Sequence, residues 1–162
     1  EEILHKINNS PEFSNFHIKV DNYIGEKLVK FGWGSSFGRT GVTCLFKKGT
    51  KEWGQNRVHP KIIFKGKFGP DLKNPIKHYF VKNISELFKK FDNWTYLKSL
   101  DILESNKKET LLNNLRRIFS RFFKNYYKKR GYKEGKLGFL ISLLAGLYPI
   151  ISYLRSEIEK DR

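Results

Sequence analysis

The hydrophobic period of the chain changes near His78, and this change constrains the fold more than any other feature of the sequence. Before His78, apolar residues recur at every second position, as in Phe16, Ile18 and Val20, which is the period of a half-buried strand. After His78 they recur at a period of about 3.6 residues, as in amphipathic helices. Strands followed by helices predict an α+β fold.

Three short strands are predicted in the central block. β-branched and aromatic residues favour strands over Val42–Phe46, Arg57–Phe64 and Ile76–Val81. Turns at Lys48-Gly49 and Gly69-Pro70 separate these strands. Because strands hold side chains more rigidly than loops do, we expect a chemical site in this block.

The segments on either side add a strand and several helices. Apolar spacing predicts a short helix over Glu1–Asn9 and a strand over Phe16–Ile24. Asn83 and Glu86 have the spacing of a capping box, which predicts the start of a long helix. The pair Asp92-Asn93 marks a candidate break in that helix.

The charge of the chain indicates an anionic partner. Its 162 residues include 32 Lys and Arg against 16 Asp and Glu, a formal net charge of +16. A charge of this size suits nucleic acid, acidic lipid or a phosphorylated substrate. Cys44 is the single cysteine, so an intramolecular disulfide is excluded and a reducing compartment fits. No signal peptide opens the chain, and we expect a cytoplasmic protein at the membrane surface.

A basic helix is predicted over Thr110–Lys129. One face carries apolar residues, namely Leu111, Leu115, Ile118, Phe122 and Tyr126. The neighbouring face carries cations, namely Arg117, Arg121, Lys124 and Lys128. Aromatic side chains beside cations suit the headgroup boundary of a membrane. They also suit stacking on bases, so a nucleic-acid-binding module is the alternative.

The run Gly138–Leu154 carries no charge and lies between Lys136 and Arg155. A helix that spans a membrane needs about 20 apolar residues, and this run is shorter and contains Gly146 and Pro149. We therefore expect a helix that lies in the membrane interface or packs partly on the domain. The residues predicted to insert into the membrane are Phe139, Leu143, Leu147 and Ile151. Together with the basic helix, they predict a membrane-associating tail over residues 105–162, after a domain over residues 1–104.

An ordered series of motifs in the central block carries a resemblance to a known family. The series consists of Leu45-Phe46-Lys47, Trp53, Val58-His59, the turn from Gly66 to Leu72, and His78-Tyr79. It resembles the C-terminal half of family 2 glycosyltransferases of the lipopolysaccharide-core type. The start, Glu1-Glu2-Ile3-Leu4, is similar to the residues that follow the family's Asp-x-Asp-Glu metal motif. The basic, glycine-rich turn near Gly131 resembles the family's ending, where such a turn introduces an apolar, membrane-facing helix.

The resemblance implies the C-terminal part of a GT-A-like fold and an enzyme. Such an enzyme transfers a sugar from a nucleotide-sugar donor to a lipid-linked or lipopolysaccharide-core acceptor, with a divalent metal, Mg or Mn, at the donor diphosphate and a carboxylate as base. By the resemblance His59 meets the metal or the diphosphate; the alternative is a structural strand histidine. The residues predicted to bind acceptor or phosphate are Arg39, Lys47, Arg57 and His78.

Two departures from the family pattern leave the catalytic base unlocated. Pro60 follows the Val-His pair where family members carry an acidic residue, and Cys44 replaces a basic residue. Glu52 and Asp71, beside the strands, are the candidates for the base. The glycine-rich stretch from Gly32 to Gly41 lacks the Gly-Lys-Ser/Thr ending of a phosphate loop. A connecting loop, or a loop near the acceptor, fits it better.

The sequence therefore predicts the acceptor-side region of a glycosyltransferase that builds cell-envelope glycan at the inner membrane face. We expect the isolated chain to be incomplete and inactive. A basic nucleic-acid-binding module and a non-catalytic, membrane-associated remnant are the alternatives.

Overall fold

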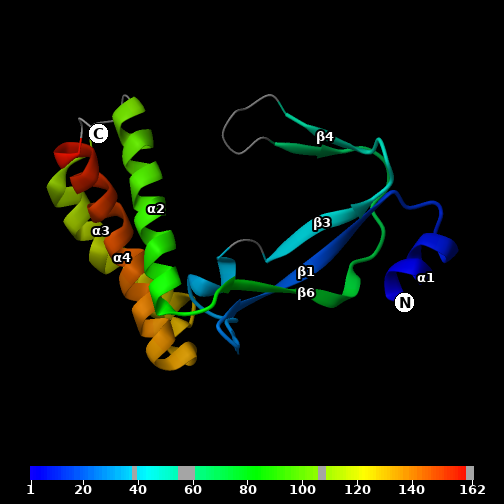
Figure 1. The fold of residues 1–162 in the computed structure, drawn as a ribbon, viewed down its shortest axis with the longest axis horizontal. Coiled ribbons are helices and arrows are strands. Elements are labelled where there is room, and N and C mark those ends of the chain that lie inside the picture. Colours follow the sequence, from blue (N-terminus) through cyan, green and yellow to red (C-terminus); the bar gives the residue numbers. More distant parts are fainter. Residues whose placement is uncertain (38–39, 55–60, 106–108, 160–162) are drawn as a thin grey trace. The chain divides into compact units, whose positions relative to one another are not determined.

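The computed structural model of the protein describes residues 1–37, 40–54, 61–105 and 109–159. It is an α+β structure in which antiparallel strands precede long helices, as predicted (Figure 1). The chain forms two compact units. The first comprises residues 1–21 and 39–78, and the second residues 22–38 and 79–162.

The strands form one sheet and one hairpin. β1 (Asn15–Ile24) pairs antiparallel with β2 (Lys27–Leu28) and with β3 (Gly41–Phe46), and β6 (Leu72–Val81) also pairs with β1. β4 (Lys51–Trp53) and β5 (Ile62–Phe64) form the separate hairpin. The predicted strands over 16–24, 42–46 and 76–81 are confirmed, and β6 begins four residues earlier than expected. Of the predicted strand 57–64, residues 57–60 lie outside the described part of the chain.

The first unit has a small core and a helix attached to its sheet. Phe16, Ile18 and Leu72 are buried together. Helix α1 (Glu2–Asn9) is the predicted N-terminal helix. Its Glu2 carboxylate accepts hydrogen bonds from the backbone N–H groups of Lys73, at 2.7 Å, and Asn74, at 3.1 Å. These donors favour the charged form and hold the pKa of Glu2 below its ordinary value.

Three long helices build the second unit: α2 (Ile84–Glu104), α3 (Leu111–Phe123) and α4 (Gly135–Ile158). α2 and α3 both pack against α4, and the three lie side by side in Figure 1. The predicted capping box starts α2, because the Glu86 N–H donates to Asn83 Oδ1 at 2.9 Å and the Glu86 carboxylate accepts from the Lys82 N–H at 2.8 Å. The candidate break at Asp92-Asn93 is wrong. Phe91 and Thr95 are both buried, so the buried face of α2 continues through these polar residues.

α4 is the central helix of the second unit. The helical stretch Gly131–Ile158 is long and apolar enough to cross a membrane by length and composition. Its apolar window of 18 residues has a mean hydropathy of 1.9, but 50% of that window is buried inside the structure. Ile141 and Leu144 join Leu87 and Phe91 of α2 in the core. The buried half of the run Gly138–Leu154 therefore packs on the domain, as one of the two expectations for this run states.

A buried carboxylate attaches residues 22–38 to the helices. Glu134, in the single turn η3 (Gly131–Glu134), is 6% exposed. It accepts from the N–H groups of Lys30 and Phe31 at 2.8 and 3.0 Å, and it pairs with the Lys27 ammonium at 3.3 Å. The compact units do not coincide with the predicted division at residues 104 and 105, because α2 packs along α4.

Candidate membrane-binding surface

The outward side of α3 carries a continuous row of apolar side chains. Leu111, Leu115, Phe119, Phe123 and Tyr127 follow one another in steps of four residues and are all exposed. Side chains at this spacing lie on one face of a helix. Leu112 belongs to the same side, and it is 77% exposed, while Phe119 is 66% exposed. We call these six residues the α3 outer face.

The opposite side of α3 is fixed against α4, and this contact determines which residues point outward. Asn114 and Asn125 are buried on that side, with exposures of 1% and 6%. Gly146 of α4 lies under the Ile118 carbonyl, so close that a Cβ on it would lie 2.7 Å from that oxygen. The apolar row on the outer face is therefore left without a partner in the part of the chain that the structure describes.

The row continues through a short π-helical segment, η2 (Lys124–Lys128). The rings of Phe123 and Tyr127 stack with centroids 5.7 Å apart, and those of Phe122 and Tyr126 stack at 5.4 Å. A π-helical turn inside a helix often marks a functional site. Here it adds one more aromatic ring to the outer face before the chain turns at Arg130.

Unpaired cations flank the outer face. Arg116, Lys124 and Lys128 are exposed, and no described carboxylate lies within ion-pair distance of any of them. Lys124 and Lys128 line a shallow hollow together with Phe123 and Tyr127. Between residues 105 and 136 the sequence has eleven Lys and Arg against Glu109 and Glu134. An apolar helix face with unbalanced cations at its edge is the arrangement of an interfacial membrane helix.

The residues predicted for membrane binding fall into different environments. Phe139 and Leu143 of α4 are 49% and 36% exposed, whereas Leu147 and Ile151 are half-buried and pack against the core. Arg117 pairs with Glu109, and Arg121 lines a pocket. Lys124 and Lys128 lie at the edge of the outer face.

Sequence reasoning missed the outer face itself. It grouped Leu111 and Leu115 with Ile118, although Ile118 lies on the side that meets α4. The signal that would have found the face is the unbroken four-residue spacing from Leu111 to Tyr127.

The candidate catalytic residues lie in the first unit. Glu52 is exposed on β4 and forms an ion pair with Lys65, and Asp71 is exposed just before β6. Lys47 donates to the Pro11 carbonyl at 2.5 Å. His78 is half-buried in β6. His59, Arg39 and Arg57 lie outside the described residues.

Among the described residues, no group of three His, Cys, Asp or Glu side chains lies close enough to hold a metal ion. The predicted ligand, His59, lies outside the described residues, and the metal stays a prediction.

The chain matches no family model, no curated protein and no solved structure.

Proposed function

We propose that this chain works at the surface of an anionic membrane, as the acceptor-side part of a family 2 glycosyltransferase that extends a lipid-linked or lipopolysaccharide-core glycan. The observation that carries the proposal is the α3 outer face, whose apolar side chains are exposed beside Arg116, Lys124 and Lys128. An acceptor that is held in a membrane requires an enzyme that approaches the membrane, and the outer face supplies that contact.

The two components of the outer face act together. Each Lys or Arg near an acidic leaflet contributes about 1 kcal/mol of binding free energy. Burying one large apolar side chain contributes roughly 1.5–3 kcal/mol. Stable peripheral attachment needs more than one weak signal, and α3 presents both kinds on one exposed side.

The glycosyltransferase assignment is supported by the ordered motifs from Leu45 to Tyr79. Those motifs correspond to the C-terminal half of the family, and for this reason we assign the acceptor side to this chain. The nucleotide-sugar donor and the divalent metal are implied by the resemblance, and His59, which would meet the metal or the diphosphate, lies outside the described residues.

Vesicle co-sedimentation tests the membrane contact with two matched phenylalanines. Phe119 on the outer face and Phe88 on α2 are both exposed, at 66% and 47%. Phe119→Asp removes one buried apolar side chain from the bound state, so affinity for phosphatidylglycerol vesicles falls about tenfold or more. Phe88→Asp leaves the affinity unchanged. Equal losses for the two variants would contradict the assignment of the surface to α3.

Salt distinguishes a membrane from nucleic acid as the anionic partner. The attraction of Arg116 and Lys124 to acidic lipid is screened over about 8 Å at physiological ionic strength, but the inserted side chains continue to bind. Salt therefore weakens vesicle binding without abolishing it. RNA binding would fall steeply with salt. RNA binding that Phe119→Asp leaves intact, without vesicle association, would favour the nucleic-acid module instead.

A further inference from the structure

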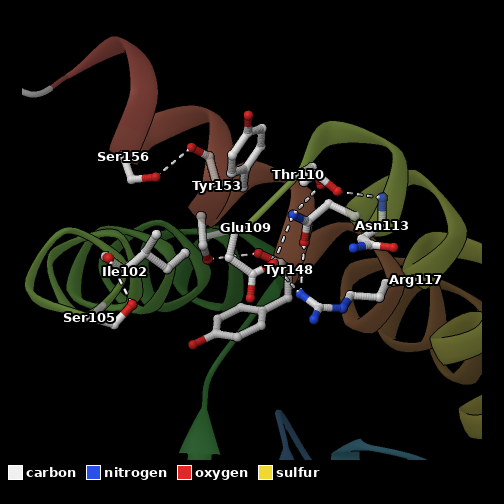
Figure 2. Close-up of polar contacts among 11 residues, drawn as sticks. Ile102, Ser105, Glu109, Thr110, Asn113, Arg117, Tyr148, Tyr153 and Ser156 are labelled. Carbon is white, nitrogen blue, oxygen red and sulfur yellow. Dashed lines mark hydrogen bonds and ion pairs between the residues drawn. The ribbon is translucent and has the colours of Figure 1, made fainter. Parts of the chain in front are cut away.

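A second site lies between α2, α3 and α4, in a pocket of about 230 Å³. We call it the basic pocket, and the lining residues that matter here are Lys98, Glu109, Asn114, Arg117, Arg121 and Tyr148. Figure 2 shows the side chains of Glu109, Arg117 and Tyr148 gathered there. The basic pocket is separate from the α3 outer face, because Arg117 and Arg121 follow a different side of α3.

One wall of the basic pocket is held by a closed set of polar contacts. Arg117 Nη1 donates to Glu109 Oε2 at 2.5 Å and to Asn114 Oδ1 at 3.2 Å. The Asn114 side chain, which is 1% exposed, donates in turn to the same Glu109 oxygen at 3.1 Å. These contacts keep the Arg117 guanidinium in one orientation, and they balance its charge with Glu109 (Figure 2).

Arg121, one helical turn further along α3, has no such partner. None of the described carboxylates lies within ion-pair distance of its guanidinium. Lys98, by contrast, pairs with Asp101 at 3.3 Å in a partly exposed contact. A guanidinium offers a fork of donors that suits the oxygens of phosphate and carboxylate groups. Arg121 is exposed to solvent at the pocket and therefore gives it a positive charge that no described carboxylate balances.

Tyr148 adds a neutral donor beside this charge. Burial raises the pKa of Tyr148, and the neighbouring Arg121 partly opposes that rise. A tyrosine hydroxyl is already protonated at neutral pH at its ordinary pKa, and a raised pKa keeps it so. Tyr148 and Arg121 also line an adjoining pocket of about 290 Å³, together with Trp33, Phe37 and Trp94.

We propose that the basic pocket binds a phosphomonoester, with Arg121 as its main cation, Tyr148 as a hydroxyl donor and Lys98 at the rim. A phosphomonoester carries three acceptor oxygens and a charge of about −1.5 to −2 at neutral pH. The charge of a phosphomonoester exceeds the single charge of a carboxylate. Its several oxygens can accept hydrogen bonds from donors on two helices, Arg121 of α3 and Tyr148 of α4. The aromatic side chains of the adjoining pocket then contact the organic part of the ligand. A phosphorylated sugar and the headgroup of a phosphatidic acid both have this chemistry.

The test is a titration of the whole chain followed by NMR. The probes are glucose 6-phosphate and dihexanoyl phosphatidic acid, with glucose and dihexanoyl phosphatidylcholine as controls that lack a phosphomonoester. Saturable shifts of the Arg121 and Tyr148 signals are expected with the two phosphomonoesters only. A preference for either one identifies the source of the phosphate, and equal affinity shows that the phosphate itself is recognised.

Three variants make the result specific. Arg121→Gln removes a charge-assisted hydrogen bond that contributes about 1.5–3 kcal/mol, so affinity falls about tenfold or more. Arg130→Gln removes an exposed arginine charge outside both the pocket and the α3 outer face, and affinity is unchanged. Glu109→Gln removes the anion that competes for Arg117 and raises the affinity.

Three outcomes would overturn the proposal. The first is that the shifts are no larger than those of the control probes. The second is an equal loss of affinity for Arg130→Gln and Arg121→Gln, and the third is weaker binding after Glu109→Gln. Phe119→Asp distinguishes this site from the membrane contact. It lowers the affinity for phosphatidylglycerol vesicles about tenfold or more and leaves the affinity for glucose 6-phosphate intact, so either proposal can fail without the other.

Discussion

At the scale of single residues, Tyr148 makes the clearest prediction about protonation. Burial raises its pKa above the ordinary value of 10.0, Arg121 lowers it, and Asp101 raises it again. Because the folded pKa is raised, the stability that the neutral hydroxyl contributes is fully present below pH 10.0 and is lost as pH rises through the folded pKa. In a titration of tyrosinate absorbance, Tyr148→Phe removes an ionisation step that lies above the ordinary value. Arg121→Gln moves that step to higher pH. A curve that Tyr148→Phe leaves unchanged at its alkaline end would contradict this account.

Single residues also show which side-chain contacts can be predicted from the sequence. The capping box of Asn83 and Glu86 was predicted, because its hydrogen bonds join residues only three or four positions apart. The basic pocket was not predicted, because Lys98, Arg121 and Tyr148 come from three different helices. In the sequence, Arg117 and Arg121 are equivalent cations on one predicted face of the helix. They differ only because Glu109, eight residues before Arg117, lies against one of them and not the other.

At the scale of elements, sequence periodicity located the helices and left open which sides are buried. α3 carries apolar residues around much of its circumference, so its inward side depends on what α4 offers. α4 offers Gly146, whose missing side chain admits the Ile118 backbone. Likewise, an uncharged run suits a membrane anchor and a core helix equally well. The packing of Ile141 and Leu144 against α2 distinguishes the two for the buried half of α4.

The close contact at Gly146 predicts that adding one methyl group there, in Gly146→Ala, destabilises the fold. Alanine is a better helix former than glycine by about 1 kcal/mol, yet its Cβ would lie 2.7 Å from the Ile118 carbonyl oxygen. Because that oxygen belongs to the backbone of a packed helix, overpacking dominates and costs about 1–3 kcal/mol. Urea unfolding of Gly146→Ala should show a lower midpoint. Leu143→Ala, at a partly exposed position of α4, serves as the control and should change the midpoint less. A Gly146→Ala protein as stable as the unsubstituted chain would refute the close contact.

At the scale of the whole molecule, the change of period near His78 was enough to predict strands followed by helices. It was not enough to predict how the chain divides into compact units. The second unit includes residues 22–38, which lie among the strands in sequence. They join the helices through Glu134 and Lys27, whose hydrogen bond closes a separation of 107 residues. A local pattern carries no information about a partner at that distance.

The two units also differ in core size, which predicts unequal local stability. Phe16, Ile18 and Leu72 form the buried cluster of the first unit, whereas Leu87 and Leu144 belong to a larger cluster in the second. Segments with few buried apolar contacts open at lower free energy than the core of a domain. Native-state hydrogen exchange should therefore show weaker protection for β3 amides than for α4 amides.

Leu72→Ala tests whether the two cores respond separately. Loss of a buried leucine side chain costs about 2–5 kcal/mol, and Leu72 is 3% exposed in the core of the first unit. The variant should lower the protection of β3 amides, such as that of Leu45, by this amount. The amide of Leu144 in α4 should keep its protection, because its core contains none of the first unit's buried residues. Equal losses at Leu45 and Leu144 would show that one cooperative transition controls both units.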